Sequence, residues 1–185
     1  MKKSRNSIKG EYNYSTGISG SSVRDFQQLL EKREGQMAAQ RDLFDGIEHR
    51  MEAVKTFRGV EFINDAACES ENGIYLALID MSKPVTWITS FRGWEHIDDK
   101  LLQIIIRKVK AIIFHGEEDE KTRNFIDVLN VSSNYSEDLE TAVRMAFYAS
   151  TENDVVLFCP GTPCEESNST IDERGKSFKM SVAQL

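Results

Sequence analysis

Two cysteines mark the loop in which chemistry would be expected. Cys159 and Cys164, with four residues between them, follow a short apolar run at residues 154–158 that predicts a buried strand ending in a loop. Thiolates bind zinc, but a pair at this spacing with no nearby histidine makes a poor zinc site. We therefore expect Cys68, Cys159 and Cys164 to be reduced thiols with no metal bound.

Other reactive residue types also lack partners in the sequence. The loop after residue 158 holds no nucleophile–base pair, and the chain contains no G-x-x-x-x-G-K-[ST] motif to hold the phosphates of ATP. His49 is an isolated histidine, and such residues are more often structural than catalytic. The acidic run at residues 117–120 predicts a solvated first helical turn, because consecutive helical residues point in different directions. Residue types alone therefore indicate no reaction.

Strands and helices alternate from about residue 50 onward. This pattern predicts a three-layer α/β domain, with a mostly parallel sheet and helices on both faces. The expected strands cover residues 58–63, 84–89, 111–115, 131–134 and 154–158. The expected helices cover residues 71–81, 98–109, 117–129 and 136–147, and a last one carries Ile171, Phe178 and Val182. Ligands of such domains bind at the carboxyl ends of the strands, which include the loop after residue 158.

The N-terminal part of the chain differs in composition from this α/β domain. We expect a flexible polar tail at residues 1–20, a helical extension at residues 21–45 and the α/β domain at residues 46–185. The extension could pack on its own domain, or it could meet another protein. In the second case the contact residues would be the aromatic and apolar ones, Tyr12, Tyr14, Val23, Phe26, Leu29 and Leu30.

Charge and hydropathy exclude several classes of protein. The chain of 185 residues has a net charge of −7. Residues 1–40 carry seven Lys or Arg and four Asp or Glu, which leaves −10 for the remainder. An acidic body argues against nucleic acid as a partner. No apolar run approaches the roughly 20 residues of a membrane span, and the first residues lack the apolar region of a secretory signal, so we expect a cytoplasmic protein with no membrane contact.

Three segments resemble a known family. The sequence GIEHRME at residues 46–52, FIND at residues 62–65 and the stretch 154–179 are similar to the C-terminal domain of the Mur ligases, most of all to the branch that adds D-glutamate. The resemblance runs from about Gln36 to Leu185, and residues 1–35 have no evident counterpart. It implies a Rossmann-like fold and a link to peptidoglycan synthesis for the bacterial cell wall.

The resemblance also assigns roles to individual positions. Arg50 and Asp65 match positions that approach the ATP ribose and its surroundings in the family. The run Asp172–Gly175 and Phe178 match the closing helix, whose role is expected to be structural. In the family this domain brings the amino acid, whereas ATP and magnesium are held by a different domain. We therefore expect no cofactor here, and ATP with magnesium only if a partner domain complements the chain.

The loops that carry the family's ligand contacts differ here. The family sequence Ser-Lys-Ala-Thr-Asn after Phe-Ile-Asn-Asp is replaced by residues 66–70, so Ala67 stands at the lysine and Glu69 adds a negative charge. A second lysine, expected to meet the incoming carboxylate, is replaced by Trp94. The last loop, Ser-Pro-Ala-Cys-Ala-Ser-Phe-Asp in the family, corresponds to residues 159–166, so Cys164 stands at the serine that helps hold D-glutamate and Glu165 follows it. Like charges would disfavour an anionic ligand there.

Three functions are compatible with this pattern. A retained scaffold with rewritten loops indicates a pseudoenzyme that works as a protein-binding or regulatory module. The alternative is the amino-acid-binding domain of a split, ATP-dependent ligase whose other domains lie on a separate polypeptide. A weaker alternative is a small-molecule sensor whose acidic loops bind an amine or a nucleotide.

Overall fold

The computed structural model describes residues 47–117, 120–129, 131–164 and 169–185. The described residues all belong to one compact unit, Met37–Leu185. The predicted tail, the helical extension and the proposed partner contacts from Tyr12 to Leu30 therefore lie outside the described residues, as does Glu165.

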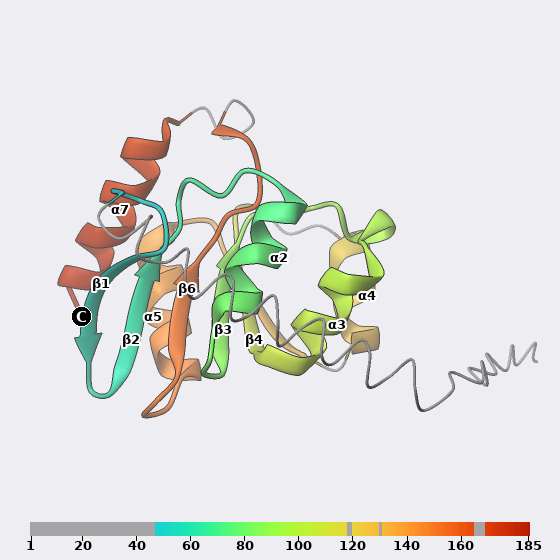
Figure 1. The fold of residues 1–185 in the computed structure, drawn as a ribbon, viewed down its shortest axis with the longest axis horizontal. Helices are drawn as coiled ribbons and strands as arrows, with labels where there is room; N and C mark the ends of the chain where they lie inside the picture. Colours follow the sequence, from blue (N-terminus) through green and yellow to red (C-terminus); the bar gives the residue numbers. More distant parts are fainter. Residues whose placement is uncertain (1–46, 118–119, 130, 165–168) are drawn as a thin grey trace, which may run out of the picture. The chain divides into compact units, whose positions relative to one another are not determined.

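Within these residues, six strands form one sheet in the order β1-β2-β6-β3-β4-β5 (Figure 1). The strands are β1 (Glu52–Phe57), β2 (Val60–Asn64), β3 (Val85–Thr89), β4 (Val109–His115), β5 (Ser132–Ser136) and β6 (Val155–Phe158). Strand β1 pairs antiparallel with β2, and every other neighbouring pair is parallel. This arrangement confirms the predicted fold class, because both central strands, β3 and β6, are buried along their whole length, as parallel strands covered on two faces must be.

The hairpin of β1 and β2 corrects one predicted boundary. Arg58 and Gly59 were expected to open a strand, but they form the turn between β1 and β2. Their φ angles are 48° and 77°, which are the values that a two-residue hairpin of the right twist requires at both central positions. Glycine accepts such an angle without strain, so the sequence Arg-Gly ends one strand and starts the next.

The helices cover both faces of the sheet. They are α2 (Glu71–Asp80), the short 3-10 helix η1 (Trp94–His96), α3 (Asp99–Lys108), α4 (Glu120–Leu129), α5 (Leu139–Ala149) and α7 (Ile171–Ala183). Helices α2 and α3 pack together on one side, while α5 and α7 pack together on the other (Figure 1). Helix α5 begins later than the expected residue 136, because Ser136 is still part of β5; Asp138 caps the helix by accepting a hydrogen bond from the backbone of Thr141.

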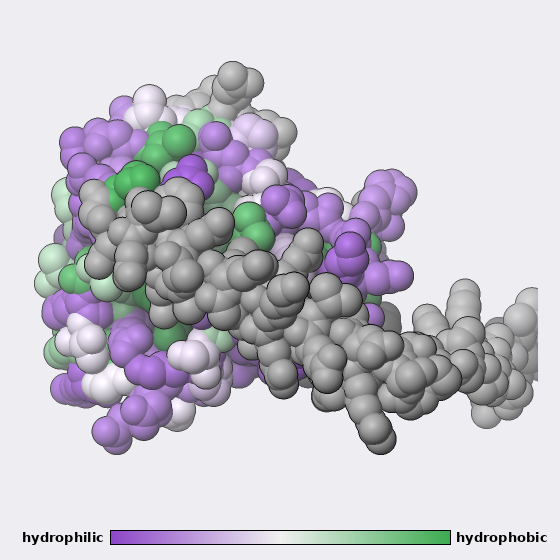
Figure 2. Space-filling view, in the orientation of Figure 1, coloured by the Kyte–Doolittle hydropathy of each residue, from purple (hydrophilic) through white to green (hydrophobic). Residues whose placement is uncertain are grey.

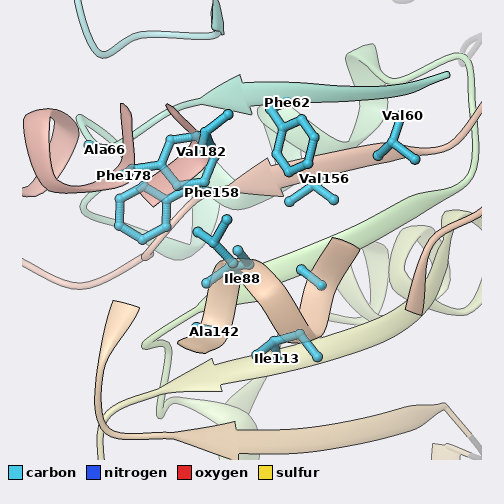
Figure 3. Packing of buried hydrophobic residues seen from close by; sticks show 12 residues of the cluster. Val60, Phe62, Ala66, Ile88, Ile113, Ala142, Val156, Phe158, Phe178 and Val182 are labelled. Atoms are coloured by element: carbon cyan, nitrogen blue, oxygen red, sulfur yellow. The ribbon is translucent and has the colours of Figure 1, made fainter. Parts of the chain in front are cut away.

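The main core lies between the sheet and the α5–α7 pair. Phe158 of β6 and Phe178 of α7 stack with their ring centroids 5.0 Å apart, and Figure 3 shows Val182 beside them. Phe62 and Val156 continue this layer along the neighbouring strands. The closing helix is thus fixed to the end of β6, which sets the position of its first turn over the carboxyl edge of the sheet.

One face of the described surface is mostly polar. Figure 2 shows hydrophilic side chains over most of the coloured face, with the hydrophobic ones in separate small groups. The described part of the chain includes no helix that is long and apolar enough to cross a membrane.

Candidate functional site

The loops that follow β2, β3 and β6 are joined by backbone hydrogen bonds at one edge of the sheet. Asp65 donates its amide to Phe158 O at 2.8 Å, and Ser90 donates to Pro160 O at 3.0 Å. Gly161 completes the set by donating to Cys68 O at 3.1 Å. Strand β6 lies between β2 and β3, and the helix that follows it covers the opposite face of the sheet from theirs (Figure 1). The loops therefore lead to opposite faces at a topological switch point, where open α/β sheets form a ligand-binding crevice.

A cleft of about 480 Å³ opens beside this crevice. It is bounded by the ends of three strands and by the first turns of α5 and α7. Its lining consists of Ser90, Arg92, His115, Gly116, Leu139, Phe158, Pro160, Thr162, Ser169, Glu173, Arg174 and Ser177. A cleft of this size, with two arginines among its polar groups, can hold a small anionic molecule.

Arg174 is the most constrained polar side chain of the cleft. It is 8% exposed, and its guanidinium donates from Nη1 to Thr162 O at 2.9 Å and from Nη2 to Ala66 O at 2.7 Å. Its Nε atom is buried and has no hydrogen-bond partner among the described residues. From its sequence position Arg174 is expected to have only a structural role in the closing helix, and its place between two loops is visible only in the folded chain.

Ser90 and His115 are the described cleft residues that come nearest to a nucleophile–base pair. Their Oγ and Nδ1 atoms lie 3.5 Å apart, which is at the outer limit of a hydrogen bond. Burial lowers the pKa of His115, so its imidazole is neutral near pH 7. Because this contact is marginal, we assign no nucleophile among the described residues of the cleft.

Trp94, at the position of the family's second lysine, lies in the core instead of in the cleft. Its side chain is 1% exposed, and its Nε1 donates to Phe91 O at 2.8 Å. The indole ring centroid lies 5.5 to 5.9 Å from those of Phe91, Phe114 and Trp87. The loop after β3 is therefore anchored by an aromatic cluster, and this position presents no cation to a ligand.

Glu69 contacts the loop after β6. Its Oε1 accepts a hydrogen bond from the backbone of Cys164 at 2.8 Å and lies 3.9 Å from Nη2 of Arg174. The Cys164 hydrogen bond lowers the pKa of Glu69, so the carboxylate is charged near neutral pH. Half-buried Ala67 donates its amide to His49 O at 3.0 Å. The expected repulsive charge at Glu69 is therefore engaged by an amide and a nearby arginine.

Asp65 and Arg50, the two positions matched to nucleotide contacts, lie near each other but differ in burial. Arg50 is exposed, whereas Asp65 is 5% exposed and accepts a hydrogen bond from the backbone of Met51 at 3.2 Å. Burial raises the pKa of Asp65 to about 6. The thiols of Cys68 and Cys159 are its buried neighbours, and burial raises the pKa of the Cys159 thiol. Asp65 is therefore an interior carboxyl group.

His49 joins the first described segment to the closing helix. The ring is 4% exposed, with Nδ1 at 3.0 Å from the side-chain amide of Asn64 and Nε2 at 3.4 Å from Asp172 Oδ1. Asn64 in turn donates to Gly175 O at 3.3 Å. These contacts give His49 a structural place between β2 and α7.

Comparison with known proteins gives a consistent set of relatives. No family model matches the chain. UDP-N-acetylmuramoylalanine–D-glutamate ligase of Christiangramia forsetii is 31% identical over 189 residues, which cover 100% of this chain and 41% of that protein. The enzyme of the same name from Chloroherpeton thalassium is 31% identical over 143 residues, covering 77% of this chain and 30% of that protein. The chain thus spans less than half the length of these relatives.

The first of these matches also corrects an expectation. Because it covers the whole chain, residues 1–35 do have a counterpart in a relative. Among solved structures, UDP-N-acetylmuramate–alanine ligase of Thermotoga maritima is 15% identical, with a TM-score of 0.49 over 76% of this chain and 31% of that one. A bifunctional folylpolyglutamate synthase/dihydrofolate synthase of Yersinia pestis is 17% identical, with a TM-score of 0.47 over 76% and 32%.

Proposed function

The chain is a homologue of the Mur ligases and resembles their C-terminal domain, and we propose that it is a non-catalytic member that works as a protein-binding or regulatory module. Its relatives are ligases of peptidoglycan precursor synthesis, and the process that this chain regulates would be peptidoglycan precursor synthesis. In this role the domain catalyses no ligation step.

The burial of Trp94 carries this proposal. A ligase domain that delivers an anionic amino acid needs a cation at the loop after β3, and here that position is occupied by a side chain packed against Phe91, Phe114 and Trp87. Replacing the indole by a lysine in the same place would bury an unpaired charge, which costs several kcal/mol. The local packing therefore supports a domain whose cleft no longer serves the reaction of its relatives.

A complementation assay tests the absence of catalysis. A D-glutamate ligase lacking its C-terminal domain is mixed with the full chain, ATP, magnesium, D-glutamate and UDP-N-acetylmuramoyl-L-alanine, and ADP release is measured. We expect no release above that of the truncated ligase alone. The matched control is the C-terminal domain of that ligase added in place of the chain. Product formation with the chain, at a rate near that of the control, would overturn the proposal.

The regulatory role needs a positive measurement of its own. The chain is titrated into the intact D-glutamate ligase of the same organism, and we expect a saturable change in the ligase rate together with complex formation in sedimentation velocity. The double substitution Phe26→Ala with Leu30→Ala should weaken both effects if the N-terminal segment carries the contact, whereas Gln27→Ala with Gln28→Ala should not. An unchanged rate and two separately sedimenting species at high concentration contradict the regulatory role.

The cleft favours a second candidate, the amino-acid-binding domain of a split ATP-dependent ligase. Its supporting observation is that Arg174 and Arg92 both line the cleft, because guanidinium groups can bind a carboxylate that enters it. This candidate predicts ATP turnover when a P-loop partner is supplied, and loss of that turnover in Arg50→Ala. A D-glutamate-dependent rise in melting temperature that Arg92→Ala removes would support it over the first.

A further inference from the structure

Three side chains that can bind metal converge beneath the loops after β2 and β6. A carboxylate oxygen of Asp65 and the sulfur atoms of Cys68 and Cys159 all lie within 4.8 Å of one another. The three residues are 5%, 5% and 0% exposed. Interior positions of this kind normally hold apolar side chains, because burying a carboxylate costs free energy unless it is paired.

The backbone holds two of these residues as a chelating pair. The amide of Cys68 donates to Asp65 O at 2.9 Å, which closes a tight turn and brings their side chains to the same point. Cys159 comes from the other loop, and its amide is fixed by Ile88 O at 3.0 Å. Asp65 is joined to that loop as well, through its own amide and Phe158 O. All three ligand atoms are therefore carried by backbone that is hydrogen-bonded to the central strands.

The separation of the three ligand atoms suits a single ion. Zinc binds sulfur at about 2.3 Å and carboxylate oxygen at about 2.0–2.2 Å, so tetrahedral ligand atoms lie roughly 3.3–3.8 Å apart. The observed upper limit of 4.8 Å requires side-chain movements of about 1 Å at most to reach that geometry. A Cβ on Gly73 would stand 2.8 Å from the Cys68 sulfur, so glycine at this position leaves the room that the thiol occupies.

The two thiols are also unusual for the chain's own family pattern. Cys68 replaces the alanine of Ser-Lys-Ala-Thr-Asn, and Cys159 replaces the first serine of the last loop. Cys68 and Cys159 are far apart in the sequence, and in the fold they meet beside a third ligand.

We propose that Asp65, Cys68 and Cys159 form a binding site for one thiophilic divalent cation of the zinc class. Water occupies the fourth position. Binding releases one proton from each thiol to solvent, and the ion's two positive charges then face two thiolates and one carboxylate. The site lies outside the residues of the 480 Å³ cleft and does not depend on the proposed regulatory function. Its role is structural, since it ties the loop after β2 to the loop after β6.

Cobalt(II) substitution tests this site in the full chain. The reduced protein is treated with chelator, desalted and titrated with Co²⁺, and we expect a sulfur-to-cobalt charge-transfer band that saturates at one ion per chain and disappears when Zn²⁺ is added. Cys68→Ser and Cys159→Ser should each lose the band. Cys164→Ser is the matched control and should keep it at full intensity, because Cys164 is the one cysteine outside the cluster.

A second measurement needs no substitution and covers the case in which a variant does not fold. The wild-type chain is alkylated under mild denaturation with and without Zn²⁺, and the modified cysteines are mapped by mass spectrometry. Zinc should protect Cys68 and Cys159 and leave Cys164 reactive. The proposal is overturned by equal protection of all three thiols, by a charge-transfer band that survives in folded Cys68→Ser and Cys159→Ser, or by a Cys68–Cys159 disulfide in place of metal binding.

Discussion

The carboxylate of Glu69 accepts a hydrogen bond of 2.8 Å from the backbone amide of Cys164. These residues lie in the loops that follow β2 and β6, and both stand at positions where the family pattern has neutral polar side chains. The contact converts a charge that would repel an anionic ligand into a link between two loops. It also brings Glu69 within 3.9 Å of Arg174, the buried cation of the cleft.

Glu69→Gln should cost little at neutral pH and change the acid dependence of stability. The pKa of Glu69 is lowered from its ordinary value of 4.5 by the Cys164 amide, so its contribution to stability is present above that pH and is lost as the pH falls through the folded-state pKa. Because the side chain is partly exposed, we expect a loss below about 1 kcal/mol at pH 7.

Urea unfolding of wild type and Glu69→Gln at pH 7 and pH 3 measures this difference. The two proteins should converge in stability at the lower pH. Exposed Glu152→Gln is the control and should leave the pH dependence of the wild type unchanged. A gap that widens as the pH falls contradicts the assigned hydrogen bond.

Gly175→Ala should destabilise the domain although alanine favours helices. A Cβ at Gly175 would lie 2.0 Å from Nδ1 and 2.3 Å from Cγ of His49, and the whole ring would have to move. The higher helix propensity of alanine stabilises the folded state by about 1 kcal/mol, whereas overpacking destabilises it by about 1–3 kcal/mol. Because the Cβ would lie so close to the ring, we expect a cost at the upper end of that range. We expect a net loss of roughly 2 kcal/mol in denaturant unfolding.

A double-mutant cycle identifies the cause of that loss. His49→Ala should make Gly175→Ala nearly neutral, because it removes the ring that the new methyl group meets. Lys176→Ala, on the exposed side of the same helix, is the control and should change stability by about 0.5 kcal/mol or less. Additive effects of the His49 and Gly175 substitutions argue against the close approach.

Asp65 should make the metal-free domain less stable as the pH rises. Its pKa is raised by burial from 3.8 to about 6, so between these values the folded state binds more protons than the unfolded state. The free energy of unfolding therefore falls across this window, by on the order of 3 kcal/mol for a shift of about two units.

Asp65→Asn keeps an oxygen to accept the Met51 amide and removes the ionisation. In the presence of chelator we expect the variant to be more stable than wild type at pH 7 and similar to it at pH 4, as followed by chemical denaturation. Exposed Asp99→Asn serves as the control. A wild type whose stability rises through the same window shows that Asp65 is charged and well paired, against the assignment made here.

Trp94→Ala should be among the most damaging substitutions in the domain. The indole is 1% exposed and contacts three other rings, so its removal should cost about 3–5 kcal/mol. Tyr148→Ala removes an aromatic side chain from a residue that is 83% exposed and should cost about 0.5 kcal/mol. Thermal unfolding of both variants makes the comparison, and equal effects would mean that Trp94 is not part of the core.

The sequence by itself determined the architecture of this domain. Apolar runs bounded by polar residues predicted β3, β4 and β6, and apolar residues at helical spacing predicted the helices between them. Both patterns can be seen in the sequence because the residues that each element buries belong to that element. It did not locate β1, whose half-buried edge position leaves only a weak alternation. Resemblance to the Mur ligases identified the loops that carry the family's ligand contacts, but it did not show which of these loops contact one another.

Only the tertiary structure decided which residues of those loops meet. Cys159 was compared with Cys164, its neighbour in the sequence, but β6 inserts between β2 and β3 and brings it to Cys68 and Asp65 instead. The same insertion places Arg174 between Ala66 and Thr162. In the loop after β3, packing buries the side chain of Trp94 in the core. Strand order is set by the burial of whole surfaces, a property of the assembled sheet that no single stretch of sequence contains.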